Sequence, residues 1–155
     1  MSERLDTIKA IQATLETITP TNGYLHDLSG RVFRGRMYFG QTDPLPMVSI
    51  LEAPVPPEQA YGLFDNQGNA GTWELLVQGW VVDDKDHPTD PAYLLAEDVR
   101  RCLREAARKD GGMDPFGRGN HVRTVRVGPP IVRPPDEMSN KAYFWMHLYL
   151  EVVEI

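Results

Sequence analysis

The first part of the chain has the hydrophobic spacing of an amphipathic helix. Apolar residues recur at intervals of three and four, at Leu5, Ile8, Ile11, Leu15 and Ile18. This spacing places them along one stripe of a helix that runs from about Ser2 or Glu3 to Thr17. The turn-forming segment 19–23, which contains Pro20 and Gly23, then ends the helix.

Residues 24–72 contain the first strand candidates and a long irregular stretch. Tyr24–Leu28 and Arg31–Phe39 are two short candidates, separated by the turn-prone Ser29-Gly30. A third strand is predicted at Leu45–Glu52. Between Pro54 and Thr72, Pro, Gly and Asn recur without any period, which predicts a long projecting loop or an extended hairpin tip.

The later strands carry clearer patterns. Trp73–Val82 has apolar residues on both faces, so we expect a central strand that is covered on two sides. A strand from about His121 to Val127 either ends there or resumes at Ile131. In Ala142–Val153, apolar residues at even positions alternate with Tyr, Trp, His and Glu at odd positions, which is the pattern of a half-buried strand.

A second helix is predicted to begin near Pro91. Thr89 or Asp90 suits the N-cap, and proline suits the first helical turn because its missing N–H would be unpaired there in any case. The expected buried face consists of Leu95, Val99, Cys102, Leu103 and Ala106, and the polar side carries Arg100, Arg101, Arg104 and Arg108. Gly111-Gly112 is expected to end the helix.

This order of elements predicts an α+β fold. An antiparallel or mixed sheet with two main helices packed on one face is favoured, because only the second helix offers a crossover between parallel strands. The chain has 155 residues, which is the size of one ordinary domain. We therefore expect a single domain over residues 1–155, with the long loop at 54–72.

Composition and charge exclude several classes of protein. The 16 Lys and Arg residues are outnumbered by 22 Asp and Glu, and the formal charge of -6 opposes non-specific binding to DNA. The single cysteine, Cys102, cannot form an intramolecular disulfide, so intracellular folding is expected. The charged N-terminal segment lacks a signal-peptide pattern, and no apolar run approaches the ~20 residues of a membrane-spanning helix.

The residues that could carry chemistry give no catalytic or metal signature. The acidic segment Asp83–His87, with Asp90, could bind a divalent ion, but a solvated connection that favours the helix N-terminus is the preferred interpretation. Cys102 lies at a core position of its helix. The other candidates, His26, His121 and His147, are scattered over three segments. We therefore predict no enzyme activity, no cofactor and no metal.

Two groups of residues are candidate contacts with other subunits or partners. Tyr61, Leu63 and Phe64 are bulky apolar residues in an otherwise polar loop, and they either contact a partner or fold back onto the domain's own core. The second group consists of Arg31, Arg34 and Arg36. These arginines either form a basic edge that binds nucleic acid or an acidic protein surface, or belong to an ordinary solvated strand face.

The layout resembles the tail-terminator and tail-completion proteins of long-tailed bacteriophages. The resemblance rests on the N-terminal amphipathic helix, the Leu-Pro-x-Val-Ser-Ile strand at Leu45–Ile50, the Trp73–Val82 strand and the Pro91-led helix. It implies a ring, commonly a homohexamer, at the head-proximal end of the tail tube, where it stops tube growth and offers a surface for head joining. The 54–72 excursion departs from the pattern, and no functional residue carries over by motif.

The same resemblance implies the partners and the location. The partners would be other copies of the chain, the tail tube protein, a head–tail connector or neck protein, and DNA that passes through the lumen without specific binding. The protein would lie in the virion, after assembly in the host cytoplasm, with no membrane contact. Its negative charge suits an acidic lumen along which DNA slides. Two alternatives remain, a neck or head-closure adaptor and a small-ligand-binding domain that uses His26, His147, Tyr149 and the acidic segment.

Overall fold

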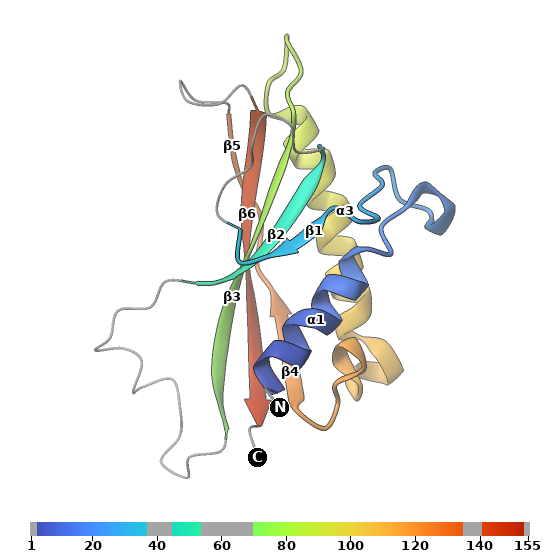
Figure 1. Ribbon diagram of the computed structural model, residues 1–155, viewed down its shortest axis with the longest axis vertical. Coiled ribbons are helices and arrows are strands. Elements are labelled where there is room, and N and C mark those ends of the chain that lie inside the picture. Colours follow the sequence, from blue (N-terminus) through green and yellow to red (C-terminus); the bar gives the residue numbers. More distant parts are fainter. Residues whose placement is uncertain (1–2, 37–44, 54–69, 135–140, 154–155) are drawn as a thin grey trace, which may run out of the picture.

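Two helices pack on one face of a six-stranded mixed sheet (Figure 1). The structure is a computed structural model that describes residues 3–36, 45–53, 70–134 and 141–153. The helices are α1 (Glu3–Leu15) and α3 (Asp90–Ala107), and the short 3₁₀ helices are η1 (Pro20–Asn22), η3 (Lys109–Gly112) and η4 (Pro115–Gly117). The strands are β1 (Val32–Arg34), β2 (Met47–Glu52), β3 (Ala70–Val82), β4 (Val122–Val127), β5 (Ile131–Arg133) and β6 (Lys141–Val153). The α+β prediction is confirmed.

The sheet is built around the two longest strands. The strand order is β1-β2-β3-β6-β4, and β5 pairs with β6 beside β4. β3 and β6 are antiparallel over 13 residues each, from Ala70 opposite Val153 to Val82 opposite Lys141. β1 and β2 are parallel, and every other pairing is antiparallel. The predicted central place of β3 is therefore confirmed.

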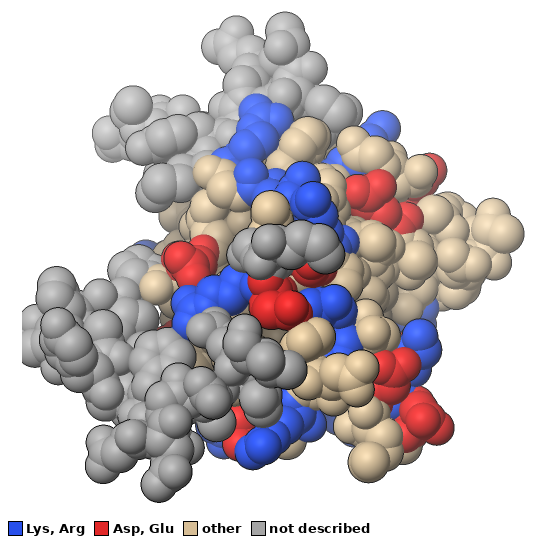
Figure 2. Space-filling model, turned by 60° about the horizontal axis from the view of Figure 1, so that its bottom comes forward, with Lys and Arg blue, Asp and Glu red and all other residues tan. Residues whose placement is uncertain are grey.

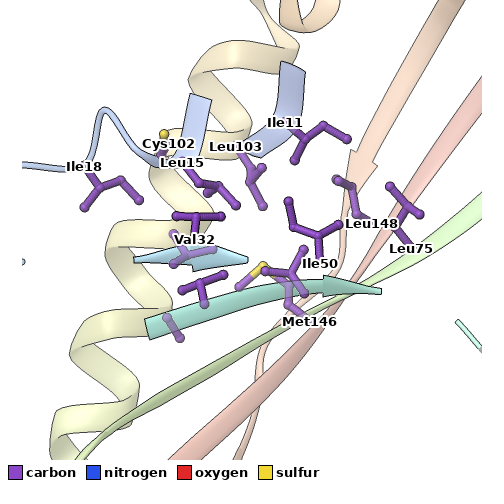
Figure 3. Packing of buried hydrophobic residues seen from close by; sticks show 14 of the residues in the cluster. Ile11, Leu15, Ile18, Val32, Ile50, Leu75, Cys102, Leu103, Met146 and Leu148 are labelled. Atoms are coloured by element: carbon purple, nitrogen blue, oxygen red, sulfur yellow. The ribbon is translucent and has the colours of Figure 1, made fainter. Parts of the chain in front are cut away.

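The hydrophobic core lies between the helices and the sheet. Because side chains alternate along a strand, one face of the β3/β6 pair is apolar throughout, with Val77 opposite Met146 and Leu75 opposite Leu148. Figure 3 shows where the buried side chains meet: Ile11 and Leu15 from α1, Leu103 from α3, Ile50 from β2, Leu75 from β3, and Met146 and Leu148 from β6. All of these side chains are almost completely excluded from solvent.

One glycine in β3 is required by the packing of this core. A Cβ on Gly79 would lie 2.3 Å from the Phe144 ring, which belongs to the opposite residue of β6 and is fully buried. Such a distance is far inside van der Waals contact, so any larger residue at position 79 would displace the ring. Gly79 thus leaves the space that the largest fully buried side chain of the core occupies.

The second helix forms as its sequence predicts. Its buried residues are Ala92, Leu95, Ala96, Asp98, Val99, Cys102 and Leu103. Ala106, which we expected on the same face, packs partly buried against the core. Thr89 is the N-cap residue, although its side chain makes no capping hydrogen bond. The helix ends at Ala107, before the Gly111-Gly112 pair that we expected to end it, and that pair instead closes the 3₁₀ helix η3, where Gly111 is in the left-handed conformation.

Two strand predictions in the N-terminal half differ from the structure. Tyr24–Leu28 is not a strand, because the N–H groups of Leu25 and His26 donate to the Asp98 carboxylate rather than to a neighbouring strand. Within the predicted Arg31–Phe39 strand, β1 covers only Val32–Arg34, and residues 37–39 lie outside the described residues.

Two expectations about the middle of the chain also need correction. Residues 70–72 of the predicted loop belong to β3, and 54–69 lie outside the described residues. β3 is only partly covered on its second face, where Trp80 is buried, Leu76 is half-buried and Val82 is exposed. Among the helices that the structure describes, none has the length and apolar character needed to cross a bilayer.

Candidate interaction surfaces

The sheet face without helices carries an aromatic row. Along β6, side chains that point away from α1 and α3 alternate with the core residues. We call this outward row the aromatic face, and it consists of Tyr143, Trp145, His147 and Tyr149. All four are half-buried. The helices cover only the other face of the sheet (Figure 1), so among the described elements this row faces outward.

Contacts within the aromatic face hold its rings in place. The ring centroids of Tyr143 and Trp145 are 5.8 Å apart, and those of His147 and Tyr149 are 6.0 Å apart in a stacked arrangement. Nδ1 of His147 lies 2.5 Å from a carboxylate oxygen of Glu74 on the neighbouring strand β3. The rings of this surface thus contact one another in pairs, and the Glu74 carboxylate of β3 and the Arg126 guanidinium of β4 lie beside them.

Toward β1 and β2, the outward side chains of the sheet are less accessible to solvent. On the same side of the sheet, Met47 and Ser49 are fully buried, although neither faces the helices. The Ser49 hydroxyl accepts the backbone N–H of Arg36 at 3.1 Å, and the Arg36 guanidinium lies 4.7 Å from the Phe33 ring. The more accessible part of this face therefore lies over β6.

A second surface follows the outer side of α3. Four arginines, Arg100, Arg101, Arg104 and Arg108, line a shallow groove together with Glu97, Asp98 and Glu105. We call these four residues the arginine face. Arg101, Arg104 and Arg108 are exposed, and Arg100 is partly exposed. On the face drawn in Figure 2, basic and acidic side chains are interspersed, and neither sign of charge dominates the described surface in that view.

One of the four arginines is already engaged within the chain. Arg101 donates to the backbone oxygen of Gly23 at 2.8 Å, and its guanidinium lies 4.2 Å from the Tyr24 ring centroid. The Tyr24 hydroxyl donates to Glu105 at 3.3 Å. Burial raises the pKa of Tyr24 to about 12, with smaller contributions from neighbouring Cys102 and Glu105. Between residues that the structure describes, Arg100, Arg104 and Arg108 form no ion pair.

The acidic segment before α3 forms an ordered turn. One carboxylate oxygen of Asp84 accepts the backbone N–H groups of Asp86 and His87 at 2.9 and 3.0 Å. These hydrogen bonds, first from His87 and then from Asp86, lower the pKa of Asp84. Within the described ranges, no group of three or more His, Cys, Asp or Glu residues is placed to hold a metal ion.

A buried contact between a carboxylate and a histidine, which the sequence did not reveal, attaches α3 to the chain after α1. Asp98 is 8% exposed, and its carboxylate lies 2.7 Å from Nδ1 of His26. The same carboxylate oxygen accepts the N–H groups of Leu25 and His26. The sequence signal that could have indicated this contact is the position of Asp98, an acidic residue next to Leu95 and Val99 on the apolar stripe of the helix.

The candidate residues from the sequence are placed separately. Arg31 donates to the Leu45 backbone oxygen at 3.0 Å, Arg34 is exposed at the end of the edge strand β1, and Arg36 lies over Phe33. The apolar candidates Tyr61, Leu63 and Phe64 lie outside the described residues.

The histidines and the cysteine are not brought together. The three candidate histidines each contact a different carboxylate, with His26 beside Asp98, His121 beside Glu3 and His147 beside Glu74. Cys102 is buried, as expected, and its thiol donates to the Thr14 backbone oxygen at 3.3 Å. Burial raises the pKa of this thiol.

The described surfaces define an α+β domain with one helix-covered sheet face, one aromatic face and an arginine-lined helix. Comparison of the sequence with models of known protein families and with curated proteins finds no match. Functional inference therefore rests on this geometry and on the order of the elements.

Proposed function

We propose that the protein is a structural subunit of a long-tailed bacteriophage. In this proposal it forms a ring at the head-proximal end of the tail tube, ends tube polymerisation and provides the surface to which the head is joined. The observation that carries the proposal is the outward aromatic face on a sheet whose other face is already packed against α1 and α3.

The chemistry of the aromatic face suits contact with protein. Tyr and Trp are enriched at the centres of protein interfaces, because they bury a large area and keep a polar group for hydrogen bonding. Tyr143, Trp145 and Tyr149 lie in one row on the long strand β6, where the backbone is held by hydrogen bonds from both sides. A partner that binds this row would meet a preorganised surface, which lowers the entropic cost of association.

Termination of a tube requires two kinds of contact on one subunit. Tube subunits with head-to-tail contacts form an open polymer, so growth ends only when a subunit binds the growing end without reproducing it. The terminating subunits must also bind one another to close a ring. The aromatic face and the arginine face lie on opposite sides of the β3/β6 layer, so one can serve the tube or the head while the other serves a neighbouring copy.

The net charge agrees with passage of DNA. A chain with a formal charge of -6 presents more carboxylates than cations, and carboxylates repel phosphate. A lumen lined by such subunits would not hold DNA. This supports a passive conduit in preference to a DNA-binding role.

Deletion of the gene from its phage tests the proposal. We expect overlong tubes without heads, seen by negative-stain electron microscopy, and recovery of normal tail length when the wild-type gene is supplied in trans. Tails of normal length beside unjoined heads would instead assign the protein to the neck. Unaltered infectious particles would overturn a virion role.

A matched pair of variants tests the aromatic face in the same assay. The double variant Trp145→Ser and Tyr149→Ser should fold but fail to restore tail length, because the outward row is removed while the core residues of β6 remain. Tyr93→Ser is the control, since Tyr93 is a 56% exposed aromatic residue on α3. Equal recovery by both variants would remove the aromatic face from the mechanism.

A further inference from the structure

We propose that the arginine face of one copy binds the acidic turn of the next copy, so that neighbouring subunits in the ring meet head to tail through charge. The acidic turn is defined here as Asp83, Asp84, Asp86 and Asp90. This inference rests on the proposed function, since it names the contact between the copies of that ring.

The arginine face has unused binding capacity. Arg104 and Arg108 are exposed and Arg100 is partly exposed, and these three form no ion pair with another residue that the structure describes. Arg100 also has a buried Nε without a hydrogen-bond partner among the described groups. A guanidinium presents several N–H donors in a planar fork that matches a carboxylate, so the groove fits a carboxylate-bearing partner.

The acidic turn is exposed and ordered, so its carboxylates can bind in such a groove. It projects beyond the first turn of α3, at the top of Figure 1. Asp84 holds the turn through two backbone hydrogen bonds, whereas the Asp86 and Asp90 side chains are exposed and Asp83 is partly exposed. The turn thus carries free carboxylates on an ordered backbone.

The two surfaces cannot meet within one molecule. Both are fixed to α3: the acidic turn lies at its N-terminal end, and the arginines follow from its second half onward. At the rise of an α-helix, Arg100 and Arg108 lie about 15 and 27 Å along the axis from Asp90. A contact between them must join two copies. Because different patches meet, the contact is heterologous, which is the type that closes into a ring when the rotation permits.

Charge within the groove favours protein over nucleic acid as the occupant. Glu97 and Glu105 stand among the arginines, and they would repel a phosphate backbone along the length of α3. An aspartate-bearing turn is short enough to reach individual arginines between these carboxylates. A second copy of this chain supplies such a turn at equal concentration.

Charge exchange between the two surfaces tests the contact in the full-length protein. Self-association is measured by sedimentation velocity at low salt for Arg104→Glu/Arg108→Glu, for Asp83→Lys/Asp86→Lys, and for the chain with all four changes. Asp84 is left in place because it organises the turn. Each double variant should weaken association by at least about tenfold, because like charges then face each other, and the fourfold variant should recover it.

Controls separate the contact from folding and from total charge. Lys9→Glu/Arg123→Glu changes the net charge as much as Arg104→Glu/Arg108→Glu but lies on α1 and β4, so association should be unchanged. Thermal melts establish that each variant folds. Mixed disulfides between separate Asp86→Cys and Arg104→Cys proteins give a readout that does not depend on charge, and they should exceed those of either protein alone.

Several outcomes would overturn the contact. They are a wild-type chain that stays monomeric at every attainable concentration, variants that associate like the wild type, a fourfold variant that shows no recovery, or DNA retention that depends on Arg104 and Arg108. Overlong tails after gene deletion, combined with any of these results, would leave the proposed function standing without this contact. Normal infectious particles after deletion would remove the function, whatever the charge variants show.

Discussion

Asp98 is a single buried carboxylate that fixes the chain after α1 against α3. It accepts two backbone N–H groups and contacts His26, so its removal leaves several donors without an acceptor. Asp98→Ala should therefore lower the free energy of unfolding by about 2–4 kcal/mol. Urea denaturation measures this, and Glu97→Ala, on the exposed side of the same helix, should change it by no more than about 0.5 kcal/mol. Equal losses of stability in the two variants would contradict the proposed role of Asp98.

Gly79 stabilises the core because it has no side chain that would overlap its neighbour. Gly79→Ala should destabilise the fold by about 1–3 kcal/mol, because the new Cβ would overlap the buried Phe144 ring. In the Phe144→Leu background the same change should cost less, since leucine leaves the space that the ring occupied. A double-mutant cycle from chemical denaturation gives the coupling between the two sites. Strict additivity would contradict the proposed overlap.

Tyr24 predicts how stability depends on alkaline pH. The folded state raises the pKa of its hydroxyl from 10.0 to about 12, which means that folding favours the protonated form. The contribution of Tyr24 to stability should be constant below pH 10 and fall as pH rises from 10 toward 12, because the unfolded chain then ionises before the folded one. Tyr24→Phe should flatten this part of the profile. The raised pKa of Cys102 acts in the same direction, so Cys102→Ala serves as the background.

At the scale of elements, the helices and most strands were predictable, including the short β4 and β5, whereas the segment 24–28 was not. α1, α3, β2, β3 and β6 follow from repeating apolar patterns, since their stabilisation comes from a continuous buried face. The 24–28 segment has strand-forming residues, but its backbone N–H groups are taken by a carboxylate 72 or more residues away. No local pattern predicts such a contact.

The candidate surfaces were predictable to different extents. The outward row of β6 follows from alternation alone, and the arginines of α3 follow from helical spacing. The stacking of Arg101 on Tyr24, and the lack of ion pairs between Arg104 or Arg108 and other described residues, depend on how distant segments pack. The interactions of Arg31 and Arg36 within the chain were hidden for the same reason.

The two faces of β6 should respond differently to truncation. Met146 is fully buried, so Met146→Ala should lower the free energy of unfolding by about 2–4 kcal/mol. Tyr143, three positions earlier, is only half-buried on the opposite face, and Tyr143→Ala should cost about 1 kcal/mol. Denaturant titration of both variants measures the difference. A larger loss for Tyr143 would mean that the aromatic face is covered within the monomer.

At the scale of the whole molecule, the proposed contact between copies makes assembly sensitive to salt. The screening length falls from about 30 Å at 0.01 M to about 3 Å at 1 M ionic strength, so association through the arginine face and the acidic turn should weaken as salt rises. Sedimentation velocity over a salt series measures this. Association that strengthens with salt would indicate that burial of the aromatic face is the driving force.

The position of β6 in the sheet has a consequence for synthesis. β6 lies between β3 and β4, yet Lys141–Val153 comes after every other element that the structure describes. Until these residues have left the ribosome, β3 lacks its longest described partner, and β4 lacks the strand neighbour that the structure describes for it. A nascent chain therefore cannot complete this sheet until β6 has been synthesised. Any activity that needs the finished sheet, including the capping of a growing polymer, becomes available only after translation has passed β6.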